Sequence, residues 1–433
     1  MEETQVDVAT PTAPSETQPE LTSDGMPRRY QRRNFMLFMF WTGIFSMGWE
    51  MPQVVRIPFL IWLGASERVM GLIGCVSFMS LFGLAFGPAL SRRYTRKKWV
   101  QFLLGMPYLL CDLAVGIGIL VSMKIGGGPW LLSFAVVCFM LWPFFGGWGS
   151  VPYQEFTANC ISRERIGAFV GVSQIVGPLL GLLGTVLMTY LMVRFSVPLR
   201  YAIAFLIAYV MAQGAASLSL LAHETPSPQP PLEPFWRPAV IAVTSDIRFR
   251  RLLIAGGVGQ FLMAFPYSFV PFLAIREWGM PDWIAGILMT VMMVSGIAGA
   301  AVATWVGQKK GYSISLLIGL ILFAFSMALL IVPRLSKSDV GWSNPDVWRF
   351  VIVGVAYGAA GRFFGVSINS LMYLLATPER RGGYFSAFGI TQSIAPGIAS
   401  LISGFAFVHG HYQSAFAGAL IAVCLAVVWL YPR

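Results

Sequence analysis

Twelve apolar stretches, each about as long as a membrane-spanning helix, dominate this sequence of 433 residues. A helix needs about 20 apolar residues to cross the hydrocarbon core of a bilayer. Only 11% of the residues are charged, against about 25% in an average soluble domain, so a soluble enzyme or nucleic-acid binder is excluded. The stretches cover approximately residues 35–62, 69–90, 99–123, 129–156, 166–191, 199–222, 252–275, 283–306, 313–333, 347–375, 384–408 and 414–432. We therefore predict an all-α integral membrane protein.

Two segments interrupt this pattern. Residues 1–27 hold six acidic residues and no Lys or Arg, and such a composition is typical of a disordered tail. Residues 223–251 contain six prolines, which indicates a stiff linker, and Thr244 to Arg251 could form a short surface helix. The predicted organisation is a tail (1–33), a six-helix bundle (34–222), a linker (223–251) and a second six-helix bundle (252–433).

The basic residues are distributed unevenly between the two sides. If the N-terminus is cytoplasmic, 20 of the 30 Lys and Arg residues lie on the cytoplasmic side, nine lie on the outer side and one, Arg362, lies within a helix. This bias satisfies the positive-inside rule. It predicts a multi-pass protein of the cell (inner) membrane with both termini in the cytoplasm, and it explains the net charge of +11 without nucleic acid.

The two halves repeat. The segment Gly171-Val-Ser-Gln-Ile-Val-Gly-Pro178 and the segment Gly389-Ile-Thr-Gln-Ser-Ile-Ala-Pro396 align at an offset of 218 residues. The same offset places Arg163 on Arg381. Chance similarity between glycine-rich helices is the alternative, but the position of the linker between the matches favours an internal repeat.

With this layout the chain resembles the major facilitator superfamily. The loop after the second stretch, Gly87-Pro-Ala-Leu-Ser-Arg-Arg-Tyr-Thr-Arg-Lys-Lys98, is similar to the superfamily's Gly-x-x-x-Asp-Arg-x-Gly-Arg/Lys motif, although Ser91 replaces the acid. Gly177-Pro-Leu-Leu-Gly181 is similar to the core of its antiporter motif. The resemblance implies twelve transmembrane helices in two pseudo-symmetric six-helix bundles, with helices 1, 4, 7 and 10 lining a central cavity.

Ionisable residues inside a bilayer normally face a cavity or a partner, because they cost about 2.5–3.5 kcal/mol at the bilayer centre. Glu50, Asp112 and Arg362 qualify. The resemblance places Glu50 and Arg362 on cavity-lining helices, whereas Asp112 is expected to be a structural acid. The predicted substrate and proton pathway consists of the pair Glu50 and Arg362 and of polar residues that share a helical face with one of them or lie opposite. Its residues are Glu50, Gln53, Gln260, Tyr267, Arg362 and Asn369. A Glu–Arg pair that only holds two helices together is the alternative.

Charged residues near the predicted cytoplasmic side suggest a gate. Glu155 precedes two arginines and could pair with loop arginines such as Arg92; an ordinary interfacial salt bridge is equally compatible with the sequence. The predicted gate residues are Arg92, Arg93, Glu155, Arg163 and Arg381. Gly354, Gly358, Gly361 and Gly365 have the spacing of close helix contacts.

The sequence lacks the common motifs of hydrolases, metalloproteases and nucleotide-binding proteins. We therefore predict no enzyme activity, no cofactor and no metal. The leading hypothesis is a monomeric secondary active transporter that moves a small organic solute by alternating access, coupled to protons or to another ion. The alternative is a non-transporting membrane protein of the same fold, such as an assembly factor or a sensor.

Overall fold

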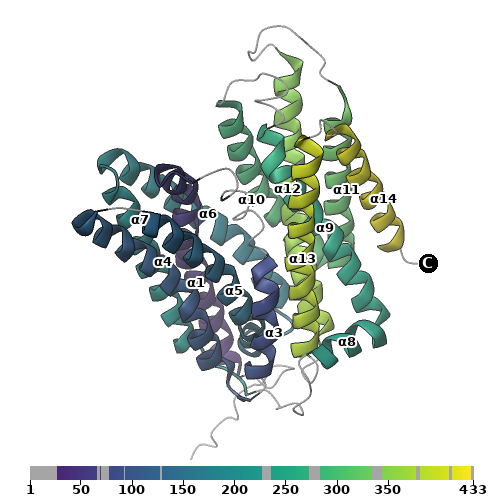
Figure 1. Ribbon diagram of the computed structural model, residues 1–433. Coiled ribbons are helices and arrows are strands. Elements are labelled where there is room, and N and C mark those ends of the chain that lie inside the picture. The colour runs from purple at the N-terminus through teal and green to yellow at the C-terminus, as the bar shows by residue number, and fades with distance from the viewer. Residues whose placement is uncertain are drawn as a thin grey trace, which may run out of the picture.

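The computed structural model describes residues 27–65, 69, 78–91, 93–126, 129–226, 236–272, 283–333, 344–376, 381–408 and 412–430. The elements in these residues are helices (Figure 1). The N-terminal group contains α1 (Arg28–Trp62), α3 (Met79–Ser91), α4 (Lys97–Ile125), α5 (Pro129–Cys160), α6 (Ile166–Arg194), α7 (Leu199–Leu218) and the short 3-10 helix η2 (Ser219–Leu221). The C-terminal group contains α8 (Trp236–Ser245), α9 (Ile247–Phe272), α10 (Trp283–Lys310), α11 (Tyr312–Ile331), α12 (Pro345–Leu375), α13 (Arg381–Val408) and α14 (Tyr412–Leu430).

Each predicted apolar stretch overlaps a helix, and the second stretch is described only from residue 78 onward, apart from residue 69. The short surface helix of the linker, however, lies earlier than predicted, over Trp236–Ser245. The boundary between α8 and the next helix lies at Asp246. The Oδ1 of Asp246 accepts hydrogen bonds from the backbone N–H groups of Arg248 (2.9 Å) and Phe249 (3.1 Å). This capping starts a new helix, α9, at Ile247.

Seven helices in the described ranges are long and apolar enough to cross a membrane. Their outward surfaces carry apolar side chains such as Val210 on α7, which is 65% exposed, and on the shorter apolar helix α14 Val428 is 73% exposed. Exposed apolar surface of this extent is unfavourable in water and suits contact with lipid. The structure thus supports an integral, multi-pass membrane protein.

The internal packing of the N-terminal group recurs in the C-terminal group. In the first group α1 packs on α6 and α7, and both α3 and α4 pack on α5. In the second group α9 packs on α13 and α14, and both α10 and α11 pack on α12. These matching neighbours are what the sequence repeat predicts for two copies of one helical arrangement.

The two groups contact each other through two pairs of surfaces. Helix α6 of the first group packs on α10 and α12, and helix α13 of the second group packs on α3 and α5. In Figure 1 the groups approach each other at the end that carries α8, and they separate toward the opposite end. We refer to these as the α8 end and the opposite end.

Candidate functional site

A polar face of α1 packs against one face of α6 in the middle of the N-terminal group. A Cβ atom added to Gly177 would lie 2.9 Å from the Ser46 Oγ, and one added to Gly181 would lie 2.9 Å from the Glu50 Cγ. The two glycines of the Gly-Pro-x-x-Gly motif therefore provide the space that Ser46 and Glu50 occupy. This contact brings the predicted carboxylate to the side of α6.

The same face of α6 reaches the second group one turn nearer the α8 end. Arg362 on α12 donates a hydrogen bond of 2.6 Å from its Nη1 to the Oε1 of Gln174, and its side chain packs on Gly296 of α10. Gln174 is the glutamine of the repeated segment. A side-chain amide therefore carries the polar contact between the two groups at this depth.

The structure places Glu50 and Arg362 at different points along one face of α6. Arg362 is the cation whose charge acts on the Glu50 carboxylate. However, the α6 residues that they contact, Gln174 and Gly181, are seven positions apart, or about 10 Å along the helix axis. The two charges are thus arranged in tandem along α6, and each can interact with a different part of a solute.

The remaining predicted pathway residues lie on helices of this region. Gln53 on α1 and Gln260 on α9 are partly buried. Asn369 on α12 donates a 2.8 Å hydrogen bond to the Gly365 carbonyl of its own helix. Tyr267 belongs to α9, but its side chain lies outside the described residues.

Asp112 is buried in α4, with 6% of its surface exposed. The charge of Arg56 on α1 acts on it. The Arg56 guanidinium lies over two rings of α5, 4.9 Å from the Phe139 centroid and 4.6 Å from the Trp142 centroid. This arrangement is compatible with the structural role predicted for Asp112.

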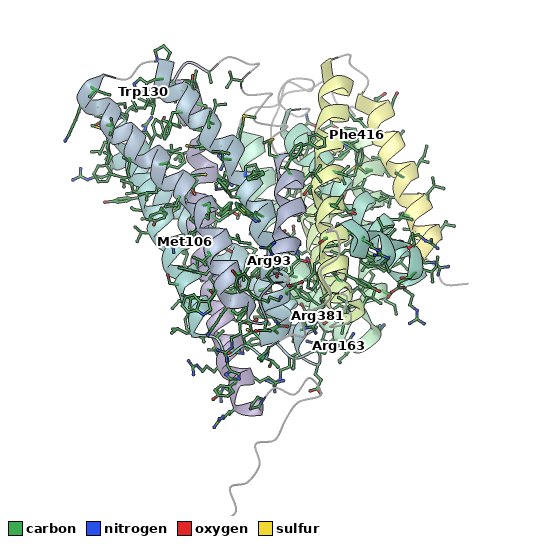
Figure 2. All side chains as sticks on the ribbon, turned by 60° about the horizontal axis from the view of Figure 1, so that its bottom comes forward. Arg93, Met106, Trp130, Arg163, Arg381 and Phe416 are labelled. Carbon is green, nitrogen blue, oxygen red and sulfur yellow. The ribbon has the colours of Figure 1, made fainter. Side chains whose placement is uncertain are left out.

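Arg163 and Arg381, the two arginines related by the repeat, make reciprocal contacts at the α8 end. Arg163 precedes α6 and donates to the Leu374 carbonyl at the end of α12 (2.6 Å). Arg381 begins α13 and donates to the Ala158 carbonyl near the end of α5 (3.4 Å). Helix C-termini carry partial negative charge, which favours such cations. Both arginines face the end that comes forward in Figure 2.

Glu155 forms a buried contact with Ser91, the residue that replaces the acid of the loop motif. The Ser91 hydroxyl donates to Glu155 Oε2 (2.5 Å), and the Lys97 ammonium lies 3.5 Å from the same oxygen. Lys97 also donates to the Ser91 carbonyl (2.5 Å). Arg92, the partner predicted for Glu155, lies outside the described residues, and Arg93 is exposed. The Glu155 carboxylate of α5 thus lies next to Ser91, the position at which the loop motif has its acid.

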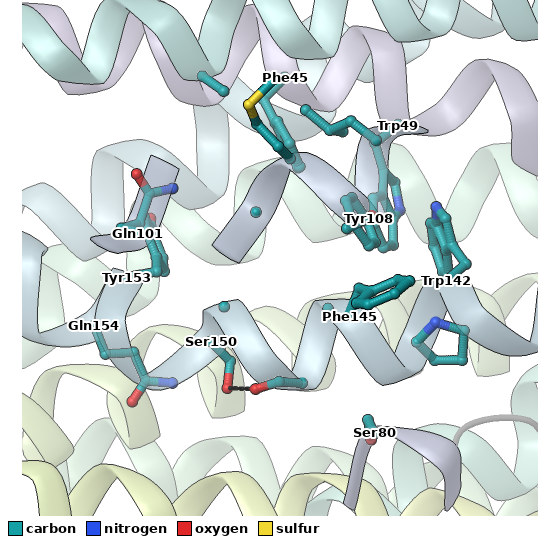
Figure 3. A pocket seen from close by; sticks show the side chains of 18 of the residues that line it. Phe45, Trp49, Ser80, Gln101, Tyr108, Trp142, Phe145, Ser150, Tyr153 and Gln154 are labelled. Atoms are coloured by element: carbon teal, nitrogen blue, oxygen red, sulfur yellow. Dashed lines mark hydrogen bonds between the residues drawn. The ribbon is translucent and has the colours of Figure 1, made fainter. Parts of the chain in front are cut away.

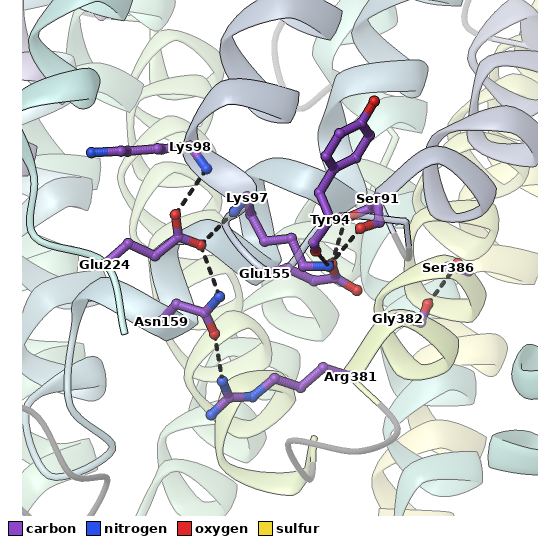
Figure 4. A network of polar contacts seen from close by, with 10 residues as sticks. All are labelled: Ser91, Tyr94, Lys97, Lys98, Glu155, Asn159, Glu224, Arg381, Gly382 and Ser386. Carbon is purple, nitrogen blue, oxygen red and sulfur yellow. Dashed lines mark hydrogen bonds and ion pairs between the residues drawn. The ribbon is translucent and has the colours of Figure 1, made fainter. Parts of the chain in front are cut away.

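A second acid, Glu224, links the loop after η2 to this network (Figure 4). Its carboxylate accepts hydrogen bonds from the backbone N–H groups of Lys97 (2.6 Å) and Lys98 (3.0 Å) and from the Asn159 side chain (3.1 Å). Asn159 in turn accepts a 3.2 Å hydrogen bond from Arg381. The carboxylate caps the positive end of α4 and connects it through one amide to the second group.

Sequence reasoning did not select Gln174, Lys97, Asn159 or Glu224 as site residues. Gln174 carried a signal, because it is one of the residues that the two repeated segments share. Glu224 carried none, since an acid in a proline-rich segment is ordinary for a solvated linker. Only the folded chain places it at the start of α4.

Several solved structures share this fold. The Escherichia coli fucose:proton symporter FucP is 13% identical, with a TM-score of 0.72 over 93% of this chain and 98% of that one. The proton:xylose symporter XylE is 12% identical, with a TM-score of 0.72 over 93% and 95%. A bacterial homologue of the iron transporter ferroportin in an outward-facing state is 14% identical, with a TM-score of 0.70 over 92% and 98%. At these identities the similarity establishes the fold.

Comparison of the sequence with protein families gives one match. Residues 276–433 match the family model described as Major Facilitator Superfamily. The comparison with curated proteins gives no match. The resemblance predicted from the sequence is thus confirmed, since the family model covers residues 276–433 and the shared fold covers most of the chain, and the comparisons identify no subfamily.

Proposed function

We propose that this protein is a secondary active transporter that moves a small organic solute by alternating access between its two helical groups. The observation that carries the proposal is the polar line along α6, where Glu50, Gln174 and the Arg362 guanidinium follow one another between the two groups. Charged and amide side chains at this depth are costly unless a polar ligand or pathway uses them. Transport by the symporters of the same fold is consistent with this use.

The proposal includes an orientation and a domain organisation. The α8 end would be cytoplasmic, as the positive-inside bias predicts, and the contacts of Arg163 and Arg381 would close that side. The bundles would be residues 34–222 and 252–433, joined by the linker 223–251. In this state the solute would reach the polar line from the opposite end.

Proton coupling is assigned to Glu50, since a carboxyl group within the membrane can carry a proton across as the bundles rearrange. The Arg362 guanidinium acts on this carboxyl through its charge, and a bound solute that engages Arg362 would alter that influence. Solute binding and protonation would thereby be linked through one face of α6.

The first test is mass-detected uptake of metabolite mixtures into proteoliposomes under an inward proton gradient. The Glu50→Gln variant should lose gradient-driven accumulation and retain exchange of internal for external solute, because exchange needs no net proton movement. The Arg362→Ala variant should instead weaken solute binding. If wild-type protein changes no component of the mixtures relative to empty liposomes, the transport function is wrong. If Glu50→Gln still concentrates the solute, the coupling role is wrong.

A further inference from the structure

A cavity of about 540 Å³ lies inside the N-terminal group (Figure 3). Its walls come from α1, α4, α5 and α7, and residues of α3 and α13 close one side. This volume lies within the range of small-molecule sites, roughly 300–1,000 Å³. The cavity is distinct from the Glu50–Arg362 line but adjoins it, because Thr42 and Ser46 of the polar face of α1 belong to its lining.

One wall is a stack of aromatic rings. The Trp49 and Trp142 centroids are 4.4 Å apart, Tyr108 and Trp142 are 4.7 Å apart, and Trp49 and Tyr108 are 5.7 Å apart. The ring planes differ by 31° or less in each pair. Phe45 extends the stack beyond Trp49 at 6.1 Å. Aromatic rings in a cavity wall offer a flat ligand ring partners for offset-stacked or edge-to-face contact.

The lining is electrically neutral in the part of the chain that the structure describes. Its polar side chains are hydroxyls, aromatic N–H or O–H groups and the amides of four glutamines, Gln101, Gln154, Gln213 and Gln392. No Asp, Glu, Lys, Arg or His is among the described lining residues. A charged ligand buried there would meet no charged side chain in the lining, and burying an unpaired charge costs several kcal/mol. The lining therefore favours an uncharged ligand.

Several polar atoms of the lining are buried without a hydrogen-bond partner among the described residues. They are the donors Trp41 Nε1 and Tyr108 OH and the acceptors Gln154 Oε1 and Gln213 Oε1. Trp41 and Tyr108 are only 6% and 8% exposed. Leaving such a group unpaired costs about 1–3 kcal/mol. A ligand that carries both acceptors and donors at its edge would satisfy atoms of both kinds.

Glycines keep the space between the rings and the amides open. A Cβ atom on Gly105 would meet only the Gln101 amide nitrogen, at 4.0 Å, and one on Gly146 would lie 3.4 Å from the Tyr108 ring. Gly105 is therefore a position where a larger side chain enters the cavity rather than the packed protein.

The wall formed by α3 and α13 joins this cavity to the movement of the two groups. Ser80 on α3 and Ser393 on α13 both line the cavity, and the Ser80 hydroxyl donates a 2.7 Å hydrogen bond to that of Ser393. This contact lies between the two groups, so a rearrangement of one group against the other would open or close the cavity.

We propose that this cavity is a binding site for an uncharged, flat heteroaromatic compound with hydrogen-bonding groups at its rim, separate from the Glu50–Arg362 line. The ring lies against Trp49, Tyr108 and Trp142, and its rim groups bond to Tyr108 and to the glutamine amides. This binding site does not depend on the proposed function above.

Binding is tested on the purified full-length protein in nanodiscs, without any gradient. The probe is lumichrome, an uncharged and fluorescent heteroaromatic compound whose emission stacked indole rings quench. Saturable quenching with one site per chain is expected. Gly105→Leu should weaken binding at least tenfold, and the control Gly214→Leu, whose added side chain points to open space on α7, should leave it unchanged.

A milder variant guards against loss of folding. Tyr108→Phe removes one hydroxyl and should weaken lumichrome binding roughly 2- to 12-fold, the equivalent of one neutral hydrogen bond. The proposal is overturned if lumichrome does not saturate, if both variants bind as wild type, or if xylose or benzoate displaces the probe more effectively than an unlabelled heteroaromatic competitor.

Discussion

At the residue scale, the pKa of His223 depends on the cations around it at the α8 end. Its ring stacks on Tyr30 with the centroids 3.9 Å apart. Its backbone is fixed by Asn34, which accepts from the His223 N–H (2.9 Å) and donates to the His223 carbonyl (2.7 Å). Partial burial, followed by the nearby cations Lys98, Arg29, Arg96 and Arg33, lowers the pKa of His223 below its ordinary value of 6.5.

This lowered pKa predicts a pH dependence with a definite sign. Between the pKa of His223 in the folded protein and that in the unfolded chain, the unfolded chain binds more protons, so the contribution of His223 to stability falls as pH decreases below about 6.5. In protein with His409 and His411 replaced, histidine NMR should show the ring titrating below 6.5. Histidine titrates between about pH 5 and 8. The His223→Gln variant should therefore have a thermal stability that is less sensitive to pH between about 5 and 7. A titration midpoint above 6.5 would contradict the structure.

At the scale of elements, the glycines of α12 divide into two kinds. A Cβ on Gly358 would overlap the Met292 carbonyl oxygen of α10, whereas a Cβ on Gly361 would lie 3.6 Å from the methyl group of Met263. Their spacing in the sequence is that of close helix contact for the whole row. The structure assigns that contact to the Gly358 side, against α10, and gives ordinary van der Waals distances on the Gly361 side.

This difference yields a matched pair of variants in one helix. Gly358→Ala should lower the apparent Tm by several degrees, because overpacking a fixed backbone contact costs about 1–3 kcal/mol. Gly361→Ala should leave the Tm unchanged or raise it, because alanine is the better helix former. Fluorescence-detected size-exclusion chromatography after heating measures both. Equal stability of the two variants would mean that α10 and α12 are not in this close contact.

At the scale of the whole molecule, polar contacts from both groups meet at the α8 end. Arg163 and Arg381 each donate to the end of a helix in the other group, and Glu224 and Asn159 connect Arg381 to α4. Each charged hydrogen bond contributes about 1.5–3 kcal/mol at most. Since about 1.4 kcal/mol changes a population ratio tenfold, loss of both contacts is enough to shift the conformational equilibrium.

The Arg163→Ala, Arg381→Ala double variant should therefore open the α8 end. With the native cysteines replaced, spin labels at the exposed positions 164 and 308 report the separation of the groups by double electron–electron resonance. A population at longer distance should grow in the double variant and remain small after Arg165→Ala, a change at an exposed arginine beside the same turn. Unchanged distance distributions would show that the two arginines do not hold this end closed.

The helical, membrane-embedded nature of the chain can be predicted from the sequence alone. Each helix that crosses a bilayer needs a long apolar segment, and such segments are visible in the composition. The repeat can also be read from the sequence, because equivalent positions in two copies carry equivalent residues. It identifies Arg163 and Arg381 as equivalent positions of the two halves. The partners of these residues were decided only by tertiary structure. Gln174 reaches Arg362, and Glu224 caps α4, through contacts between segments more than 100 residues apart. The ring residues of the cavity likewise come from three helices, α1, α4 and α5. Read singly, they cannot be told from lipid-facing residues, since hydrophobicity does not specify which face of a helix meets the protein and which meets the membrane.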